Sequence, residues 1–201
     1  MRIVIAGHGW FAAKLLVERL HLGDKVLAVL PPTQIDRLAA VASSSGIRVT
    51  PAPSRVGADC IPEGTDVILA AHAHAYIGAD ARRKAQYGAL GYHPSLLPRH
   101  RGMDAVRWTL RAGDAIAGGT LYWLDDGMDT GPIAAQDFCF VLPGDDAATL
   151  WRRDLAPLGL RLFRQTLELL NLGVVTARPQ LEAAATLAPR LLDPSEIEPT
   201  T

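Results

Sequence analysis

In the first half of the chain, short apolar runs alternate with segments of helical periodicity. Apolar runs that predict strands lie at residues 2–7, 25–31, 47–50, 66–73 and 89–93. Between them, residues 11–23, 33–46 and 79–88 have helical spacing, with Thr33 as the predicted N-cap of the second helix and with Gly23 and Gly46 as stop signals. Near-continuous apolar strands separated by amphipathic helices predict βαβ units and a parallel sheet.

The second half has a different pattern. Residues 103–114 predict a helix, and residues 117–125 and 132–142 predict two long strands that pair antiparallel. Two helices follow at 145–155 and 157–173, the second beginning at Pro157, and residues 176–180 predict a short last strand. The fold class is therefore α/β: a Rossmann-like, mostly parallel twisted sheet with helices on both faces and an antiparallel pair in the second half. We expect one domain over residues 1–192 and a loose tail over 193–201.

Composition narrows the function classes. The 201 residues include 20 Lys and Arg against 21 Asp and Glu, a net charge of −1 that argues against nucleic acid as the main partner. The two cysteines lie far apart, so we expect no disulfide framework and a reducing compartment. No signal peptide or membrane-spanning run is evident, and the expected location is cytoplasmic.

The first strand ends in a glycine turn, GHGWFA, at residues 7–12. A glycine turn at a helix N-terminus can hold an anion or a carbonyl oxygen, which makes Gly7, His8, Gly9 and Trp10 candidate ligand-binding residues. The turn lacks a third glycine and a following acidic residue, so it is a weak dinucleotide motif. A tight strand-to-helix turn is the other interpretation.

Histidines stand at the carboxyl ends of two predicted strands, where open α/β sheets bind ligands. His72 and His74 follow one strand and His93 ends another. The three could form a metal site and serve a metal-dependent hydrolase, but hydrogen-bonded histidines without a metal are commoner. We expect no metal.

The strongest pattern joins His93 to an acidic turn. His93 opens a loop stiffened by Pro94 and Pro98, and the connection LDDGMDTGPI carries Asp125, Asp126 and Asp129. Turn chemistry suffices to explain Asp125 and Asp126. It does not explain why a proline-stiffened histidine loop and this turn occur in one chain.

Two motifs, HPSLLPRHRG and MDTGPI, resemble those of the folate-dependent formyltransferase family. His93 and Asp129 are 129 − 93 = 36 residues apart, which also fits the His-to-Asp spacing of that family. RIVIAGHGWFA, AGDAIAGGTLYWLDDGMDTGPIAAQ and ATLAPRL resemble further parts of that family's catalytic domain. The resemblance implies an N-formyltransferase that moves a formyl group from 10-formyltetrahydrofolate to a primary amine. His93 would be the oxyanion stabiliser and general acid, and Asp129 would favour the charged imidazole and relay a proton.

The resemblance also implies a folate pocket between two loops. One loop would contribute Ala75, Tyr76 and Ile77, and the other would contribute Leu124, Asp125, Asp126, Gly127 and Asp129.

The chain departs from the family at Gly91, where the family has the asparagine of Asn-x-His. Loss of such a donor costs on the order of a hundred- to a thousandfold in rate. Three interpretations follow. Water or another side chain, such as His72 or His74, could replace the missing asparagine side chain, or the enzyme could be slow or use an unusual substrate. The third is that the chain is a non-catalytic folate-binding pseudoenzyme.

The expected acceptor is a small amine, such as an amino sugar on a nucleotide or an amino acid derivative. Gly7, His8, Gly9, Trp10 and Gly91 would contact it, with Arg99 and Arg101 offering guanidinium groups to a phosphate or carboxylate. The alternative for the two arginines is a solvated basic loop. A tRNA acceptor is not expected, because the charge is balanced and the chain ends soon after ATLAPRL. A homodimer is left open.

Overall fold

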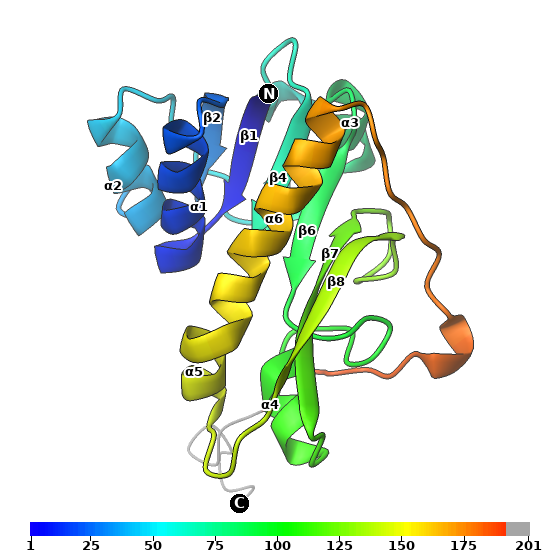
Figure 1. Cartoon of the computed structure of the whole chain (residues 1–201). Helices are drawn as coiled ribbons and strands as arrows, with labels where there is room; N and C mark the ends of the chain where they lie inside the picture. The colour runs from blue at the N-terminus through cyan, green and yellow to red at the C-terminus, as the bar shows by residue number, and fades with distance from the viewer. Residues whose placement is uncertain (192–201) are drawn as a thin grey trace, which may run out of the picture.

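The chain folds around one six-stranded sheet in the strand order β2-β1-β4-β6-β7-β8 (Figure 1). The structure is a computed structural model that describes residues 1–191, so the predicted tail at 193–201 lies outside the described residues. The first four strands of that order are parallel, and β7 pairs antiparallel with both β6 and β8. The predicted fold class, including the antiparallel pair, is confirmed.

The elements follow one another along the chain with short connections. The strands of the main sheet are β1 (Arg2–Gly7), β2 (Lys25–Leu30), β4 (Val67–Ala71), β6 (Ala89–His93), β7 (Ile116–Trp123) and β8 (Ile133–Phe140). The α-helices are α1 (Gly9–His21), α2 (Arg37–Ser44), α3 (Ala79–Lys84), α4 (Ala105–Arg111), α5 (Ala147–Leu150) and α6 (Ala156–Asn171). Two short strands, β3 (Arg55–Val56) and β5 (Tyr76–Ile77), form a separate parallel pair.

Alternation along the strands divides the core between the two faces of the sheet. In β1, Ile3 and Ile5 are buried in one cluster together with side chains of α1, α2 and α6. Val4 and Ala6 are buried in a second cluster, which includes Ala81 of α3. Strand β1 therefore buries both of its faces, as expected for a strand of a parallel sheet covered by helices.

Several predicted elements differ from the structure. Asp36, not Thr33, caps α2, because its carboxylate accepts a hydrogen bond from Leu38 N. The predicted strands at 47–50 and 176–180 are reduced to single bridges, Val49 with Val29 and Arg178 with Ile133. The β3–β5 pair was not predicted, since two-residue strands carry no periodic signal.

The two helices predicted on either side of residue 156 form one continuous helical run. A π-helical turn, η2 (Trp151–Leu155), joins α5 to α6, and Pro157 lies in the first turn of α6. Proline has no N–H for the preceding turn, and the wider π turn directly before Pro157 accommodates that missing donor.

Within residues 1–191, no helix combines the length and the apolar character needed to cross a bilayer. Cys60 and Cys139 are both free thiols.

Candidate active site

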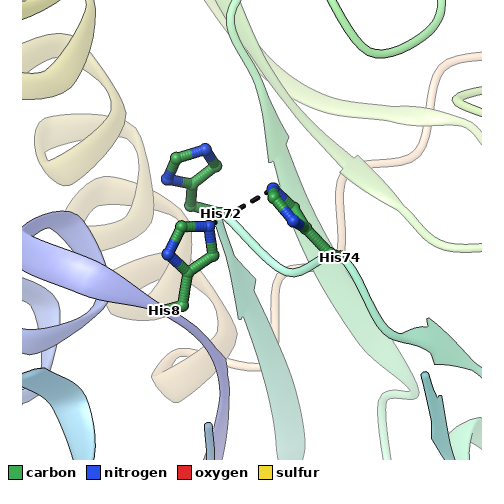
Figure 2. Close-up of side chains that lie close together, drawn as sticks. All are labelled: His8, His72 and His74. Carbon is green, nitrogen blue, oxygen red and sulfur yellow. Dashed lines mark hydrogen bonds between the residues drawn. The ribbon is translucent and has the colours of Figure 1, made fainter. Parts of the chain in front are cut away.

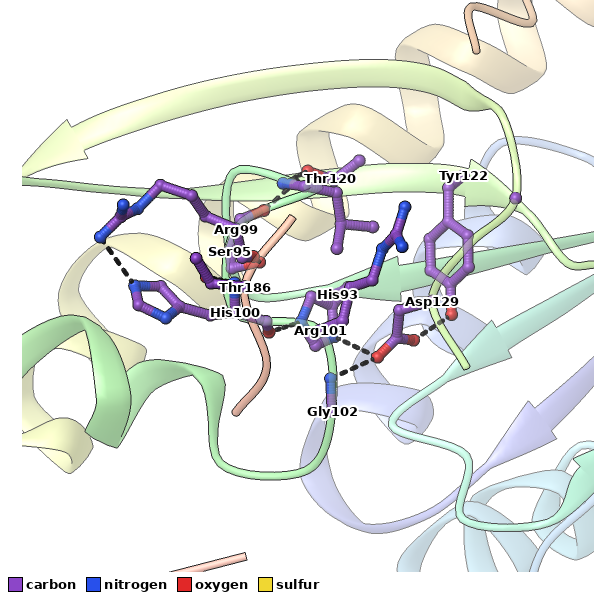
Figure 3. Close-up of polar contacts among 12 residues, drawn as sticks. His93, Ser95, Arg99, His100, Arg101, Gly102, Thr120, Tyr122, Asp129 and Thr186 are labelled. Carbon is purple, nitrogen blue, oxygen red and sulfur yellow. Dashed lines mark hydrogen bonds and ion pairs between the residues drawn. The ribbon is translucent and has the colours of Figure 1, made fainter. Parts of the chain in front are cut away.

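His93 is the last residue of β6 and its imidazole is buried, with 6% of the residue exposed. Its Nδ1 lies 3.5 Å from Asp129 Oδ2, and its Nε2 lies 2.7 Å from the carbonyl oxygen of His100 (Figure 3). The predicted histidine–aspartate pair is therefore brought together in space, from the end of β6 and from the connection between β7 and β8.

The two ring nitrogens of His93 have different partners and different freedom. A carbonyl oxygen only accepts hydrogen bonds, so Nε2 carries a proton and donates it to His100. The 3.5 Å from Nδ1 to Asp129 is longer than the roughly 2.7–2.9 Å of a charge-assisted hydrogen bond. Nδ1 is therefore held near the carboxylate and is the ring atom available to a third group.

Asp129 is surrounded by donors. Its Oδ2 accepts from Gly102 N at 2.8 Å, and its Oδ1 accepts from the Tyr122 hydroxyl at 2.6 Å (Figure 3). Burial, and then the negative charge of Asp129, raise the pKa of Tyr122 well above its ordinary value, so the phenol stays protonated and donates. Asp129 has a φ of 56°, a left-handed conformation that aspartate tolerates better than most residues.

The space beside Gly91 is occupied. Gly91 pairs across the strands with Tyr122, and a Cβ at Gly91 would lie 2.7 Å from Leu124 Cδ2 and 3.1 Å from the Tyr122 ring. The nearest atoms thus belong to Leu124 and Tyr122, and not to His72 or His74. An aromatic ring that covers a strand glycine is a known packing device, but the pairing that places Tyr122 there depends on the register of β6 against β7.

The loop after His93 is held by a buried hydroxyl that the sequence did not indicate. Thr120 Oγ1 donates to the carbonyl of Ser95 at 2.6 Å and accepts from Leu97 N at 3.0 Å and from Gln136 Nε2 at 2.8 Å. Thr120 pairs with His93 across β6 and β7, so the antiparallel register positions it under the loop. These bonds fix the loop that carries the His100 carbonyl.

Gly102 ends the same loop and needs to be glycine. Its φ is 119°, and a Cβ there would lie 2.7 Å from the carbonyl oxygen of Ala188. The segment containing Ala188 runs beside the loop, with Ala188 N bonded to the Arg101 carbonyl. The ATLAPRL segment therefore supports the loop that places Gly102 N against Asp129.

The two loop arginines are paired within the protein. Arg99 contacts both carboxylate oxygens of Asp114 at 2.8 and 2.9 Å. Arg101 is buried and binds Gln180 and Glu182. Arg101 therefore does not match a solvated basic loop, whereas Arg99 is exposed and still does. Their predicted contact with substrate stays a prediction, and the contacts seen are structural.

The two loops predicted to enclose a pterin lie next to each other. The Tyr76 hydroxyl donates to Asp126 Oδ1 at 3.3 Å, and Ala75 and Leu124 both pack against the apolar cluster that contains Val4 and Ala6. Asp125 accepts from Gly127 N and from Thr130 Oγ1, which is the turn role expected for it. Ile77 is buried in β5.

The glycine turn contains its own anion. Gly9 N donates to both carboxylate oxygens of Asp36, at 3.2 and 3.1 Å, so Asp36 occupies the N-terminus of α1. Gly7 allows the close approach of strand β4, because a Cβ there would lie 1.9 Å from the Ala71 carbonyl oxygen. Trp10 is exposed. The turn is thus built for packing, and its anion position is already filled.

His72 and His74 do not join His93. Strand β4 ends at Ala71, and both histidines lie instead against His8, with potential ligand nitrogens within 4.8 Å of one another. The combination of His72, His74 and His93 considered from the sequence is therefore wrong, because a strand continuing to residue 73 was assumed.

Sequence comparison identifies relatives of this chain. A sequence model described as formyl transferase matches residues 39–161. The cytosolic 10-formyltetrahydrofolate dehydrogenase of Mus musculus is 34% identical over 199 residues, covering 92% of this chain. The methionyl-tRNA formyltransferase of Acidobacterium capsulatum is 41% identical over 106 residues, covering 53% of this chain and 34% of that protein. The chain spans 22% of the length of the mouse protein.

Solved structures show the same fold. An N-formyltransferase from Helicobacter canadensis, in complex with folinic acid and dTDP-3-aminofucose, has a TM-score of 0.79 at 19% identity, covering 98% of this chain and 72% of its own. A phosphoribosylglycinamide formyltransferase from Bacillus halodurans has a TM-score of 0.72 at 22% identity, covering 85% of this chain and 95% of its own.

Proposed function

The chain belongs to the formyl transferase family, and from this premise we propose that it is an N-formyltransferase that uses 10-formyltetrahydrofolate and a small primary amine. The observation that carries the proposal is the pair His93 and Asp129, joined at 3.5 Å and supported by the loop after β6. A buried histidine beside a carboxylate is suited to stabilise an oxyanion and to move a proton.

The donor supplies a formyl carbon bound to its N10. The amine nitrogen bonds to that carbon and the bond to N10 breaks, so the amine loses one proton and N10 gains one. His93 Nδ1–H faces the oxyanion that develops on the formyl oxygen, and then gives its proton to N10. Asp129 Oδ2 receives the amine proton, directly or through a water, and passes it back to Nδ1.

The residues that hydrogen-bond to His93 and Asp129 would orient these two side chains for the reaction. The His100 carbonyl keeps Nε2 protonated and thereby directs Nδ1 to the reacting atoms. Tyr122 and Gly102 hold the two oxygens of Asp129, so that the carboxylate stays next to the imidazole during the reaction. Preorganised groups of this kind need no rearrangement in the transition state.

The pterin would lie between the loop with Tyr76 and the loop with Leu124. Their contact through Tyr76 and Asp126 supports the proposal, since it sets both loops at the edge of the sheet that carries Asp129.

The acceptor that we favour is a small amine. The balanced charge of the chain offers no general attraction to tRNA. Asp36 already fills the anion position at the start of α1, which disfavours an acceptor phosphate there. We retain Trp10 as a candidate stacking surface for a base or sugar because its side chain is exposed. A cytoplasmic location and a homodimer stay predictions, and light scattering of the purified chain tests the dimer.

The proposal is tested by measuring the consumption of 10-formyltetrahydrofolate with a panel of amines. The panel includes amino sugars on nucleotides, amino acid derivatives and methionyl-tRNA. We expect consumption that depends on a small amine and is lost in His93→Ala. His21→Ala, a change at an exposed histidine at the end of α1, is the matched control and retains activity. Consumption at the same rate without amine would identify water as the acceptor and contradict transfer to an amine.

A specific observation favours a second candidate, a non-catalytic folate-binding protein. Leu124 and Tyr122 fill the space beside Gly91, so no side-chain donor from that position reaches an oxyanion. This candidate predicts thermal stabilisation by a folate with no turnover on any member of the panel. The intact pair of His93 and Asp129 is the reason that we place the enzyme first.

A further inference from the structure

Three histidines from two loops converge beside the main sheet (Figure 2). Gly7 and Ala71 are paired residues at the ends of β1 and β4, so the next residues, His8 and His72, leave the sheet side by side. His74 follows two residues later. The imidazoles of His8 and His72 stack with centroids 4.2 Å apart, and His74 meets His8 edge-on at 4.5 Å.

The spacing of the nitrogens suits a metal ion. His8 Nε2 lies 3.2 Å from His74 Nε2, and one ligand nitrogen from each of the three rings falls within 4.8 Å of the others. Two nitrogens bound at about 2.0–2.1 Å to a tetrahedral Zn²⁺ lie about 3.3 Å apart. Without a metal, a hydrogen bond would account for the contact of His8 with His74 and ring stacking for that of His8 with His72, so metal binding has to be measured.

A metal-binding imidazole must offer a free nitrogen, so a carboxylate hydrogen-bonded to one of these rings would compete with the metal. The oxygens of Asp36 hydrogen-bond to Gly9 N and Leu38 N, and not to these imidazoles.

The backbone of this cluster is strained in one place. His72 has a φ of 56°, a conformation that costs a non-glycine residue on the order of 1–3 kcal/mol and that gathers at functional sites. Within residues 1–191, the other non-glycine residues with positive φ are His100 and Asp129, both in the candidate active site. The ring of this strained residue is the one that stacks on His8.

We propose that His8, His72 and His74 form a site for one divalent transition-metal ion, with Zn²⁺ as the best fit. Three neutral imidazoles leave a fourth position for water or a small ligand. A small cleft of about 30 Å³ lies next to the site and is lined in part by His8 and His74, which gives room for a water. The site contains neither His93 nor Asp129, so it stands independently of the proposed function.

The proposal is tested by measuring metal binding to the whole chain. The chain is produced without a polyhistidine tag and is stripped of metal beforehand. Calorimetric titration with Zn²⁺ should show one ion per chain, and Co²⁺ should give the visible absorption of a four-coordinate site. His8→Ala and His74→Ala should each weaken binding at least about tenfold, because each removes one of three ligands. His74 is exposed, so its replacement leaves the fold intact.

The matched control is His21→Ala, the same substitution at a histidine outside the cluster, which should bind Zn²⁺ like the unmodified chain. Absence of one-to-one binding would overturn the proposal. So would binding that persists unchanged in both His8→Ala and His74→Ala, or binding that His21→Ala removes to the same extent.

Discussion

Histidines gather in two regions of this molecule, and the two regions differ in how deeply the imidazoles are buried and in which groups surround them. In the candidate active site, His93 and His100 are buried, and each faces a carboxylate, at 3.5 Å from Asp129 and 2.9 Å from Asp114. In the cluster of His8, His72 and His74, the rings are more exposed and face one another.

The difference lies in the neighbours of each ring. An imidazole beside a carboxylate can exchange protons with it during a reaction. In the cluster, partial loss of solvent and then the nearness of His8 and His74 lower the pKa of His72 to about 4, and a neutral ring can bind a metal.

Asp129→Asn should have the largest effect. The amide keeps the shape of the side chain but removes the negative charge beside His93 Nδ1, and one of its two terminal atoms no longer accepts a hydrogen bond. We expect kcat/KM to fall roughly 10²–10³-fold, measured as amine-dependent consumption of 10-formyltetrahydrofolate. Acid–base catalysis contributes far more than twofold to a rate. If the kcat/KM of Asp129→Asn stays within about twofold of the unmodified value, the carboxylate has no part in the mechanism.

Gly91→Asn should reduce activity and not restore it. Its Cβ would meet Leu124 Cδ2 at 2.7 Å and displace Tyr122, which lies 3.1 Å away, from Asp129. We expect a loss of roughly a hundredfold in kcat/KM and a destabilisation of about 1–3 kcal/mol by urea unfolding.

The double variant Gly91→Asn with Leu124→Ala makes room for the new side chain and is the control. It should recover part of both losses. Higher activity in Gly91→Asn alone would mean that the space beside Gly91 is open and that its described packing is wrong.

Tyr122→Phe separates the hydroxyl from the ring. The ring still covers Gly91, while the 2.6 Å hydrogen bond to Asp129 is lost. A hydrogen bond to a charged group is worth about 1.5–3 kcal/mol, and part of that is expressed in the transition state, so kcat/KM should fall about tenfold. Unchanged kcat/KM together with reduced stability would assign Tyr122 a purely structural role.

Asp114→Asn should have the smallest effect, and one that depends on pH. Partial burial alone would raise the pKa of Asp114, but hydrogen bonds from His100 and Arg99 outweigh burial and hold the pKa below its ordinary value of 3.8. The carboxylate therefore stabilises the fold above about pH 4, and this contribution is lost as the pH falls through the lowered folded-state pKa.

We expect the Tm of Asp114→Asn to lie about 2–4 °C below that of the unmodified chain at pH 7, and the difference to vanish near pH 3. Asp59→Asn, at an exposed carboxylate, is the control and should show no difference at pH 7. A difference that is the same at both pH values would contradict a role for the charge of Asp114.

Much of the fold could be predicted from local pattern. The strands at residues 2–7 and 89–93 are continuous apolar runs, and β1 and β6 have those bounds. Thr33 was predicted as a cap from residue type alone, whereas the actual cap, Asp36, is chosen by a contact with Gly9 on another helix. Local pattern carries no information on such contacts.

In the candidate active site too, local pattern identifies some residues and misses those that long-range contacts place. His93 and Asp129 could be identified because their motifs carry them at a distinctive spacing. Tyr122 and Thr120 could not, because their roles depend on the register of β6 against β7, and one residue of slip would turn both away from His93. The His8 cluster depends on the pairing of β1 with β4 and on the end of β4 at Ala71.

A double-mutant cycle on kcat/KM tests most directly whether His93 and Asp129 act as one unit. His93→Ala and Asp129→Ala are measured singly and together, with formyl transfer to the best amine of the panel as the readout. The account predicts that the double variant is no slower than the slower single variant, within about threefold, because either change alone disables the pair. Losses that multiply in the double variant would show that the two residues act independently, and would contradict the account.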